Sequence, residues 1–361
     1  MSDSKRIGIL TSGGDCAGLN AILGAVVHRA SGLGWTVMGI EHGTHGLLES
    51  PPQARVLEQA DFDGTIMRRG GTILGSSNFG DPFAYPQLDD DDLDRSDEAI
   101  AGYRALGLDA LIGIGGDGSL SILDRLARKG GLNLVCIPKT IDNDVGVTEV
   151  SVGYDTAVQV ATDALDNLQP TAASHDRVMI LEVMGRDAGH IALVAGIAGG
   201  ADVILIPEIP YRIEHVVRKI KDLQASGRRF ALVVVAEAVP NEAGNKIVQK
   251  YAGGRSAYGG IGHLLGDRLA ETTRAEVRVT VLGHVQRGAA PDARDRLMAS
   301  VFGVHAVDLI AEGRFGRMVA WRDRQVVDMP IGEVVSEPAL VDLDGPVVRT
   351  ARGLGICLGD A

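Results

Sequence analysis

Two aspartates separated by one residue, Asp142 and Asp144, are the residues whose types and spacing most directly suggest chemistry. They follow an apolar run at 132–137 that predicts a buried strand, which Pro138 ends. In an extended loop the two carboxylates project to one side, where they suit a metal ion and a base. Such a pair needs a cation beside it, and Mg²⁺, Lys139 or an arginine could provide one. Spacing alone, however, favours a simple Asp-rich turn after a strand.

Two glycine-rich turns could bind phosphate groups. The first, at 11–20, follows a predicted strand and precedes an apolar-periodic helix at about 21–30. The second, at 115–119, also ends a predicted strand, and Ser119 could cap the helix that follows. Glycines let backbone N–H groups approach a phosphate at a helix N-terminus, and Asp117 could face a metal ion beside it. The first turn matches neither a dinucleotide fingerprint nor a P-loop, so it is a weak signal by itself.

Four apolar runs in the second half of the chain predict further strands, at 177–183, 201–206, 230–236 and 278–282. Ligands of open α/β sheets bind outside the carboxyl ends of the strands. The candidate site residues at those ends are Met184, Arg186, Glu237, His284 and Arg287. Taken singly, the histidine favours a structural role. Arg186 and Arg287 slightly favour a functional role, because the helix dipole disfavours a cation at a helix start. Glu237 also favours a functional role, because a carboxylate at the edge of a core needs a partner.

These loops must be positioned by the strands and helices that alternate through the chain, which predict an α/β fold with two doubly wound, largely parallel sheets. The pattern starts afresh near Tyr154. We expect one domain at 1–153 plus 286–336 and a second at 154–285 plus 337–361. The first domain carries the glycine turns and carboxylates, and the second carries the arginines, histidine and glutamate. We therefore expect metal and donor phosphates in the first, a phosphorylated substrate in the second, and the active site in the cleft between them.

Two stretches predict exposed loops rather than sites. Residues 89–98 hold seven acidic residues against one arginine, which predicts a solvated loop that enters a helix near Asp97. Residues 241–260, rich in Gly, Asn and Lys, predict a mobile loop.

Composition limits the possible classes of function. The chain has 361 residues, 45% of them hydrophobic, which is enough for two cores, and it has no apolar run long enough for a membrane span. Its polar start passes straight into a predicted strand, so we expect no signal peptide and a cytoplasmic protein. Three cysteines without C-x-x-C spacing argue against disulfides or zinc. A net charge of −12 disfavours nucleic acid or an anionic membrane as partner, and an anionic substrate would need a local cationic pocket.

With these stretches together, the chain resembles the 6-phosphofructokinase family, in its A-type subgroup of mixed ATP- and PPi-dependent members, over roughly residues 6–319. The stretches that carry the resemblance lie at 10–15, 71–76, 115–119, 139–144, 182–186 and 282–288. Their order and spacing make the match specific. The Gly-Gly-Asp-Gly stretch alone is shared with NAD kinases and lipid kinases, and the Thr-Ile-Asp-Asn-Asp stretch separates the families.

The resemblance implies a Mg²⁺-dependent glycolytic kinase. Asp142 would take the proton from the 1-hydroxyl of fructose 6-phosphate, with Lys139 and Arg186 as further catalytic residues, while Asp117 would hold Mg²⁺ with help from Asp144. The residues implied to cradle the donor are Gly14, Gly116, Asp117, Gly118 and Ser119. The residues implied to contact the sugar phosphate are Thr140, Asp142, Met184, Gly185, Arg186, Glu237, His284 and Arg287.

The resemblance also implies an oligomer. Arg177 and Arg278 match arginines that reach into a neighbouring subunit's site, so we expect a homo-oligomer, either a dimer or a tetramer.

The phosphoryl donor is less sharply defined. Gly118 leaves room for a nucleotide where PPi-dependent members typically carry aspartate, which favours ATP. Lys139 is typical of PPi enzymes but also occurs in ATP-dependent ones, and Ile122 is bulkier than the residue common in ATP users. Asn78 replaces an arginine that bridges the two reacting phosphates in most relatives, and an amide cannot supply that charge.

The leading hypothesis is therefore an enzyme that makes fructose 1,6-bisphosphate from fructose 6-phosphate and ATP. A first alternative keeps the chemistry and uses pyrophosphate as donor. A second, motivated by Asn78, is a non-catalytic regulator that binds a sugar phosphate or nucleotide. A nicotinamide oxidoreductase rests on the α/β pattern alone and lacks the dinucleotide fingerprint.

Overall fold

The computed structural model describes residues 4–77, 80–85, 93–250, 256–334 and 338–360. The chain forms two compact units, Met1–Thr156 with Arg287–Ala339, and Ala157–Gln286 with Leu340–Ala361. The sequence predicted that the two segments of the first unit would be 1–153 and 286–336. Each of these boundaries lies within three residues of the one in the structure. The functional division between the units stays a prediction.

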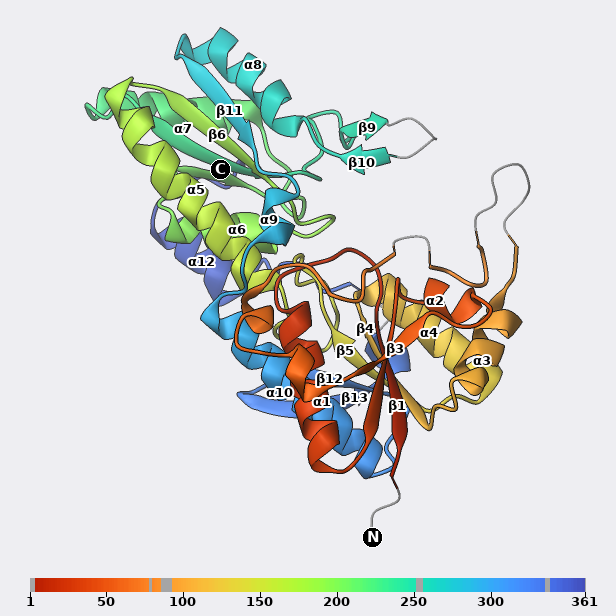
Figure 1. Cartoon of the computed structure of the whole chain (residues 1–361). Coiled ribbons are helices and arrows are strands. Elements are labelled where there is room, and N and C mark those ends of the chain that lie inside the picture. The colour runs from red at the N-terminus through yellow and green to blue at the C-terminus, as the bar shows by residue number, and fades with distance from the viewer. Residues whose placement is uncertain (1–3, 78–79, 86–92, 251–255, 335–337, 361) are drawn as a thin grey trace. The chain divides into compact units, whose positions relative to one another are not determined.

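A seven-stranded sheet forms the centre of the first unit (Figure 1). Its strands, in the order in which they lie side by side, are β13 (Gln325–Pro330), β12 (Arg317–Arg322), β5 (Leu134–Pro138), β4 (Ala110–Gly115), β1 (Arg6–Thr11), β2 (Thr36–Ile40) and β3 (Ala54–Leu57). The inner five are parallel, and the edge strands β13 and β3 are antiparallel to their neighbours. β4 is buried along its whole length, as expected for a parallel strand covered on both faces.

Helices cover both faces of this sheet (Figure 1). On one side α1 (Leu19–Gly32) packs against α10 (Ala293–Ala311), which also contacts β5 and β12. On the other, α3 (Ser96–Ala105) packs against α4 (Asp117–Gly130), which contacts β4 and β5. The short elements are α2 (His45–Leu48), α11 (Ile331–Val334) and the single turns η1 (Gln59–Asp61) and η2 (Ile66–Arg68).

The start of α4 differs from the prediction. The helix begins at Asp117, so the expectation that Ser119 caps it was wrong. Gly116 takes the cap position in an extended conformation, with φ −84° and ψ −177°. The carboxylate of Asp117 consequently lies in the first helical turn, where the helix dipole favours negative charge.

A parallel four-stranded sheet forms the second unit, in the order β11 (Val277–Val281), β6 (Val178–Val183), β8 (Ala231–Ala236) and β7 (Val203–Leu205). The remaining helices are α5 (Tyr154–Ser174), α6 (His190–Ala198), α7 (Ile213–Ala225), α8 (Ile261–Thr273), α9 (Val285–Gly288) and α12 (Pro346–Gly353). Near the end of the chain, Cys357 forms a bridge to Val203, which places the C-terminal segment beside β7.

The stretch predicted to be a mobile loop contains an antiparallel hairpin instead. Its strands are β9 (Val248–Lys250) and β10 (Ser256–Tyr258), in which Val248 pairs with Tyr258. The Gly- and Asn-rich composition concealed two strands of three residues each, too short for an alternating pattern to emerge. The acidic stretch falls partly on residues 86–92, outside the described part of the chain, and α3 begins at Ser96, close to the expected helix start.

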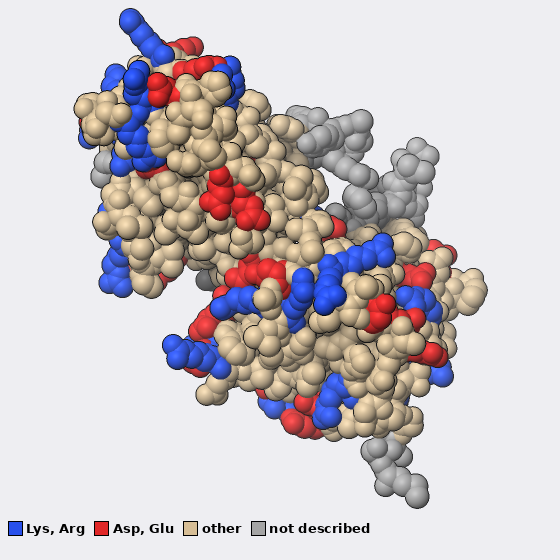
Figure 2. All heavy atoms as spheres, turned by 60° about the vertical axis from the view of Figure 1, so that its left-hand side comes forward, with Lys and Arg blue, Asp and Glu red and all other residues tan. Residues whose placement is uncertain are grey.

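Basic and acidic side chains are intermingled on the face shown in Figure 2. The net charge of −12 is therefore not gathered into one acidic patch on this face. Within the described residues, we find no helix with the length and apolar character needed to cross a bilayer.

Candidate functional site

The strand order of the first unit reverses between β1 and β4. From β1 the chain continues to β2 and β3 on one side, and from β4 to β5, β12 and β13 on the other. Ligands of such sheets bind where the order reverses, at the carboxyl ends of the strands. Both glycine turns leave the sheet there and touch each other, because a Cβ on Gly13 would lie 2.8 Å from Oγ of Ser119. The fold thus joins two turns that are about a hundred residues apart in sequence.

The loop that carries Asp142 leaves the neighbouring strand. Pro138 of β5 pairs with Gly115 of β4, and the N–H of Lys139 donates to the carbonyl oxygen of Gly115 at 2.9 Å. The hydroxyl of Thr140 donates to Oδ2 of Asp142 at 3.3 Å and accepts from the N–H of Asp142 at 3.1 Å. With its side chain held in this way and 9% exposed, Asp142 lies on a loop beside the second glycine turn.

The ammonium group of Lys139 connects this loop to the first glycine turn. Lys139 is 3% exposed, and its Nζ donates a hydrogen bond to the carbonyl oxygen of Gly14. Burial lowers the pKa of Lys139, and Arg287 lowers it further, whereas the carboxylates of Asp15 and Asp142 raise it. A buried lysine between these loops can neutralise charge on a phosphoryl group.

Arg287 lies against the same turn. A Cβ on Gly14 would lie 2.5 Å from Nη1 of Arg287, so a larger residue here would displace the guanidinium group from this position. The Nε atom of Arg287 is buried and has no hydrogen-bond partner among the described residues. Its charge therefore lies beside the turn expected to bind donor phosphates. The sugar-phosphate contact that the resemblance implied for Arg287 stays a prediction.

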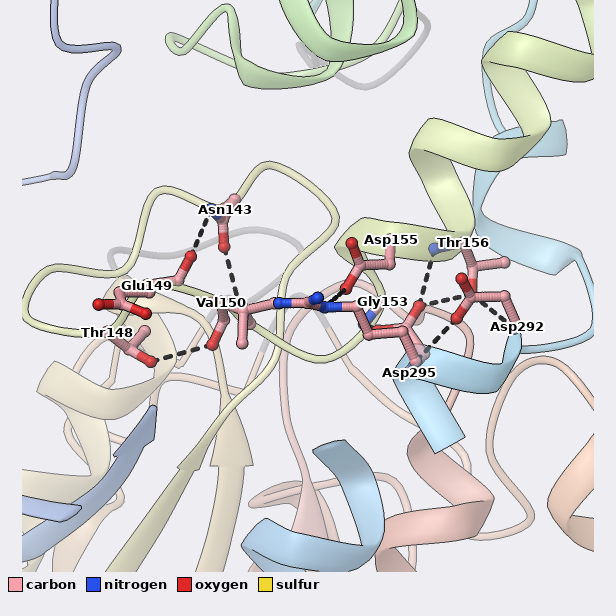
Figure 3. Close-up of polar contacts among 11 residues, drawn as sticks. Asn143, Thr148, Glu149, Val150, Gly153, Asp155, Thr156, Asp292 and Asp295 are labelled. Atoms are coloured by element: carbon pink, nitrogen blue, oxygen red, sulfur yellow. Dashed lines mark hydrogen bonds and ion pairs between the residues drawn. The ribbon is translucent and has the colours of Figure 1, made fainter. Parts of the chain in front are cut away.

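The residue between the two aspartates organises their loop (Figure 3). Asn143 has a left-handed backbone with φ 54°, and its side chain accepts from the N–H of Ser151 at 2.9 Å and donates to the carbonyl oxygen of Glu149 at 3.2 Å. At the start of the loop, the N–H of Thr140 donates to the carbonyl oxygen of Val152 at 3.2 Å. The returning segment therefore supports the loop at two points.

A buried carboxylate of α10 attaches the returning segment to the helix (Figure 3). Asp295 accepts hydrogen bonds from the N–H groups of Gly153 and Thr156, both at 2.8 Å, and from the hydroxyl of Thr156. Burial raises the pKa of Asp295 to about 6, although these hydrogen bonds act to lower it. Sequence reasoning missed this residue, since an aspartate near a helix start is an ordinary feature; Asp292 caps the same helix.

Asp117 and Asp144 are the residues expected to hold Mg²⁺. Asp144 is buried on the loop after β5, and Asp117 begins the helix after β4, the strand next to β5. Within the described residues there is no group of three or more His, Cys, Asp or Glu side chains arranged for a metal. Mg²⁺ keeps several waters and is commonly bound by one or two carboxylates together with substrate phosphates, so this pair fits it.

In the second unit, the predicted residues meet at the carboxyl ends of two adjacent strands. The residues that follow β6 are Met184, Gly185 and Arg186, and Glu237 follows β8. The N–H of Arg186 donates to Oε1 of Glu237 at 3.1 Å, and the N–H of Met184 donates to Oε1 of Gln286 at 2.8 Å. Gln286, two residues after His284, is a buried positioning residue that the sequence did not reveal.

Arg177 and Arg278 lie at the opposite end of this sheet. Arg177 precedes β6, Arg278 is the second residue of β11, and both pair with Glu276, the former at 2.8 Å. A strand of six residues spans roughly 20 Å. Within one chain these arginines are therefore separated from Met184 by about the length of a strand.

The chain matches the family model described as Phosphofructokinase over residues 6–310. It is 61% identical to ATP-dependent 6-phosphofructokinase 1 of Synechocystis sp. and 58% identical to ATP-dependent 6-phosphofructokinase 1 of Nostoc sp., and both alignments cover 100% of each chain. Phosphofructokinase from Saccharomyces cerevisiae superposes with a TM-score of 0.77 at 29% identity over 98% of this chain. The match covers 47% of the yeast chain, so this chain spans about half its length.

Proposed function

The chain belongs to the phosphofructokinase family, and from this premise we propose that it transfers the terminal phosphoryl group of ATP to fructose 6-phosphate, giving ADP and fructose 1,6-bisphosphate. The observation that carries the proposal is full-length similarity to enzymes named for this activity, combined with the convergence of both glycine turns and the Asp142 loop at one end of a sheet.

We propose that Asp142 acts as the base. Its carboxylate is oriented by the hydroxyl of Thr140 and would accept the proton of the sugar 1-hydroxyl as that oxygen attacks phosphorus. Lys139 and Arg287 would neutralise charge on the phosphoryl group, since phosphoryl transfer depends on alignment and electrostatic stabilisation. Asp117 and Asp144 would hold Mg²⁺, which when bound supplies charge neutralisation to the donor phosphates.

The turn regions of the first unit would bind the donor, through Gly14 and residues 116–119. In the second unit we assign the sugar phosphate to the residues that follow β6, β8 and β11, namely Met184, Gly185, Arg186, Glu237 and His284. Arg177 and Arg278 would serve the site of a neighbouring subunit. This assignment is supported by their position at the far end of the sheet from Met184.

ATP rather than pyrophosphate is the donor. The relatives that are 61% and 58% identical are named ATP-dependent. Space at Gly118 agrees with this, because a Cβ there would meet no heavy atom within 4 Å, which leaves room for a nucleotide. Ile122 is half-buried one turn further along α4, and Asn78 lies outside the described residues. The effect of these two residues on turnover stays a prediction.

The deciding experiment supplies the purified chain with fructose 6-phosphate and excess Mg²⁺, with either ATP or pyrophosphate, and measures fructose 1,6-bisphosphate. We expect product with ATP and little or none with pyrophosphate. Faster turnover with pyrophosphate would replace the proposed donor. If neither donor gives product while fructose 6-phosphate binds tightly, the chain is a regulator and the proposed activity is wrong.

A further inference from the structure

A pocket of about 400 Å³ lies beside the first glycine turn, within the first unit. One wall is the turn itself, with Gly13, Gly14 and Asp15, and the other is the glycine-rich stretch at 69–76, which Arg69 begins. This volume lies within the range of small-molecule sites, and its lining is mainly backbone and small polar side chains. Such a lining suits a compact polar ligand.

The charges around this pocket favour an anion. Arg69 lines it and forms no ion pair with any residue that the structure describes. Two further cations lie beside the wall that the first glycine turn forms. Nζ of Lys139 would lie 3.4 Å from a Cβ built on Gly13, and Nη1 of Arg287 would lie 2.5 Å from a Cβ built on Gly14. The carboxylate of Asp15 opposes these three positive charges. A cationic pocket in a chain of net charge −12 is the feature that an anionic ligand requires.

Asn20, in the first turn of α1, fixes the backbone that carries Arg69. Its side chain is 1% exposed; Nδ2 donates to the carbonyl oxygen of Arg69 at 3.0 Å, and Oδ1 accepts from the N–H of Ile73 at 2.9 Å. On the other side, a Cβ on Gly70 would lie 2.5 Å from the carbonyl oxygen of Gly288. The start of the stretch is thus held from two directions.

We propose that Arg69 binds the β- or γ-phosphate of the ATP donor in this pocket, and that Asn20 is the positioning residue that holds Arg69 there. A guanidinium group can bind two phosphate oxygens through paired hydrogen bonds, which a lysine cannot do. The inference rests on the proposed function, because it takes ATP as the ligand. It adds a donor contact from a part of the chain that the motif residues do not include.

The test compares Arg69→Ala with Arg68→Ala, a matched control that removes an adjacent arginine that does not line the pocket. Binding of Mg·ATP and of AMP is measured by calorimetry without sugar phosphate, so that no turnover is needed. We expect Arg69→Ala to weaken Mg·ATP binding by about 10- to 100-fold, as for loss of a hydrogen bond to a charged group, and AMP binding by much less. Arg68→Ala should leave both affinities unchanged, and Arg69→Lys should fall between wild type and Arg69→Ala.

Unchanged Mg·ATP affinity in Arg69→Ala would overturn the inference, as would equal losses for Mg·ATP and AMP. Thermal unfolding of each variant checks that the fold is intact. The failure of the proposed function looks different: the wild-type chain would then make no fructose 1,6-bisphosphate, whereas the Arg69-dependent difference between Mg·ATP and AMP could still be observed.

The role of Asn20 has its own readout. Asn20→Ala should weaken Mg·ATP binding in the wild-type background and have little further effect when Arg69 is already alanine, because Asn20 acts through Arg69. Equal losses in both backgrounds would show that Asn20 does not act by holding Arg69.

Discussion

The carboxylate of Asp295, in the first turn of α10, accepts hydrogen bonds from both the backbone N–H and the hydroxyl of Thr156, in the first turn of α5. The two residues are 139 positions apart in sequence. The other carboxylate oxygen accepts from the N–H of Gly153, so both oxygens are used. The segment that returns from the Asp142 loop is therefore fixed by a side chain near the start of the second segment of the first unit, Arg287–Ala339.

Replacing Asp295 by Asn should change how stability depends on pH. Burial raises the pKa of Asp295 from 3.8 to about 6, so between pH 4 and 6 the folded state keeps a proton that the unfolded state releases. The contribution of Asp295 to the free energy of unfolding therefore falls as pH rises through that range. At roughly 1.4 kcal/mol per pKa unit, the loss is up to about 3 kcal/mol. Urea unfolding should show wild type losing stability relative to Asp295→Asn between pH 4 and 6. A difference that stays constant with pH, or one shared by exposed Asp222→Asn, would contradict this.

Asp142→Asn should lower kcat by about 10²- to 10⁴-fold and leave fructose 6-phosphate binding nearly unchanged, because an amide cannot accept the proton but keeps the size of the side chain. Steady-state kinetics and direct binding of the sugar phosphate measure the two effects. Asp166→Asn, at an exposed position of α5, is the control and should behave as wild type. Near-normal turnover of Asp142→Asn would remove this residue as the base.

Gly118→Asp should reduce turnover with ATP by about tenfold or more. A carboxylate in the second glycine turn would repel the phosphates of the donor and would occupy the space proposed for the nucleotide. The variant should remain folded, since a Cβ at this position meets no heavy atom within 4 Å. Gly118→Ala tests the methyl group alone and should keep most of the activity. The idea fails if Gly118→Asp uses ATP as well as wild type, and turnover with pyrophosphate shows whether the donor preference has shifted.

Mixed oligomers should recover activity from two inactive variants. If Arg278 serves a neighbouring subunit, a pair made of Asp142→Asn and Arg278→Ala contains one site with both native residues. Co-expression of the two variants with different affinity tags, purification through both tags, and assay of the hybrid would show partial activity. Hybrids as inactive as the separate variants, with oligomers confirmed by light scattering, would place Arg278 outside the shared site.

The strand ends that carry the predicted site residues could be predicted because their signals are local. An apolar run, a proline and then charged residues mark the carboxyl end of β5, and the glycine turns mark the ends of β1 and β4 in the same way. The α/β class and the division into two units follow from the same periodic patterns. The hairpin of β9 and β10 was missed because three-residue strands give no measurable period.

The sequence by itself determined which residue types stand at the strand ends, since proline, glycine and apolar periodicity act on neighbouring residues through backbone geometry. Only the tertiary structure decided which of those ends meet. It brought Arg287 against Gly14, Lys139 to the carbonyl oxygen of Gly14 across 125 positions, and Asp295 to Gly153 across 142. These contacts depend on strand order and on helix packing across the sheet, and no local pattern records which distant backbone group a buried side chain will satisfy.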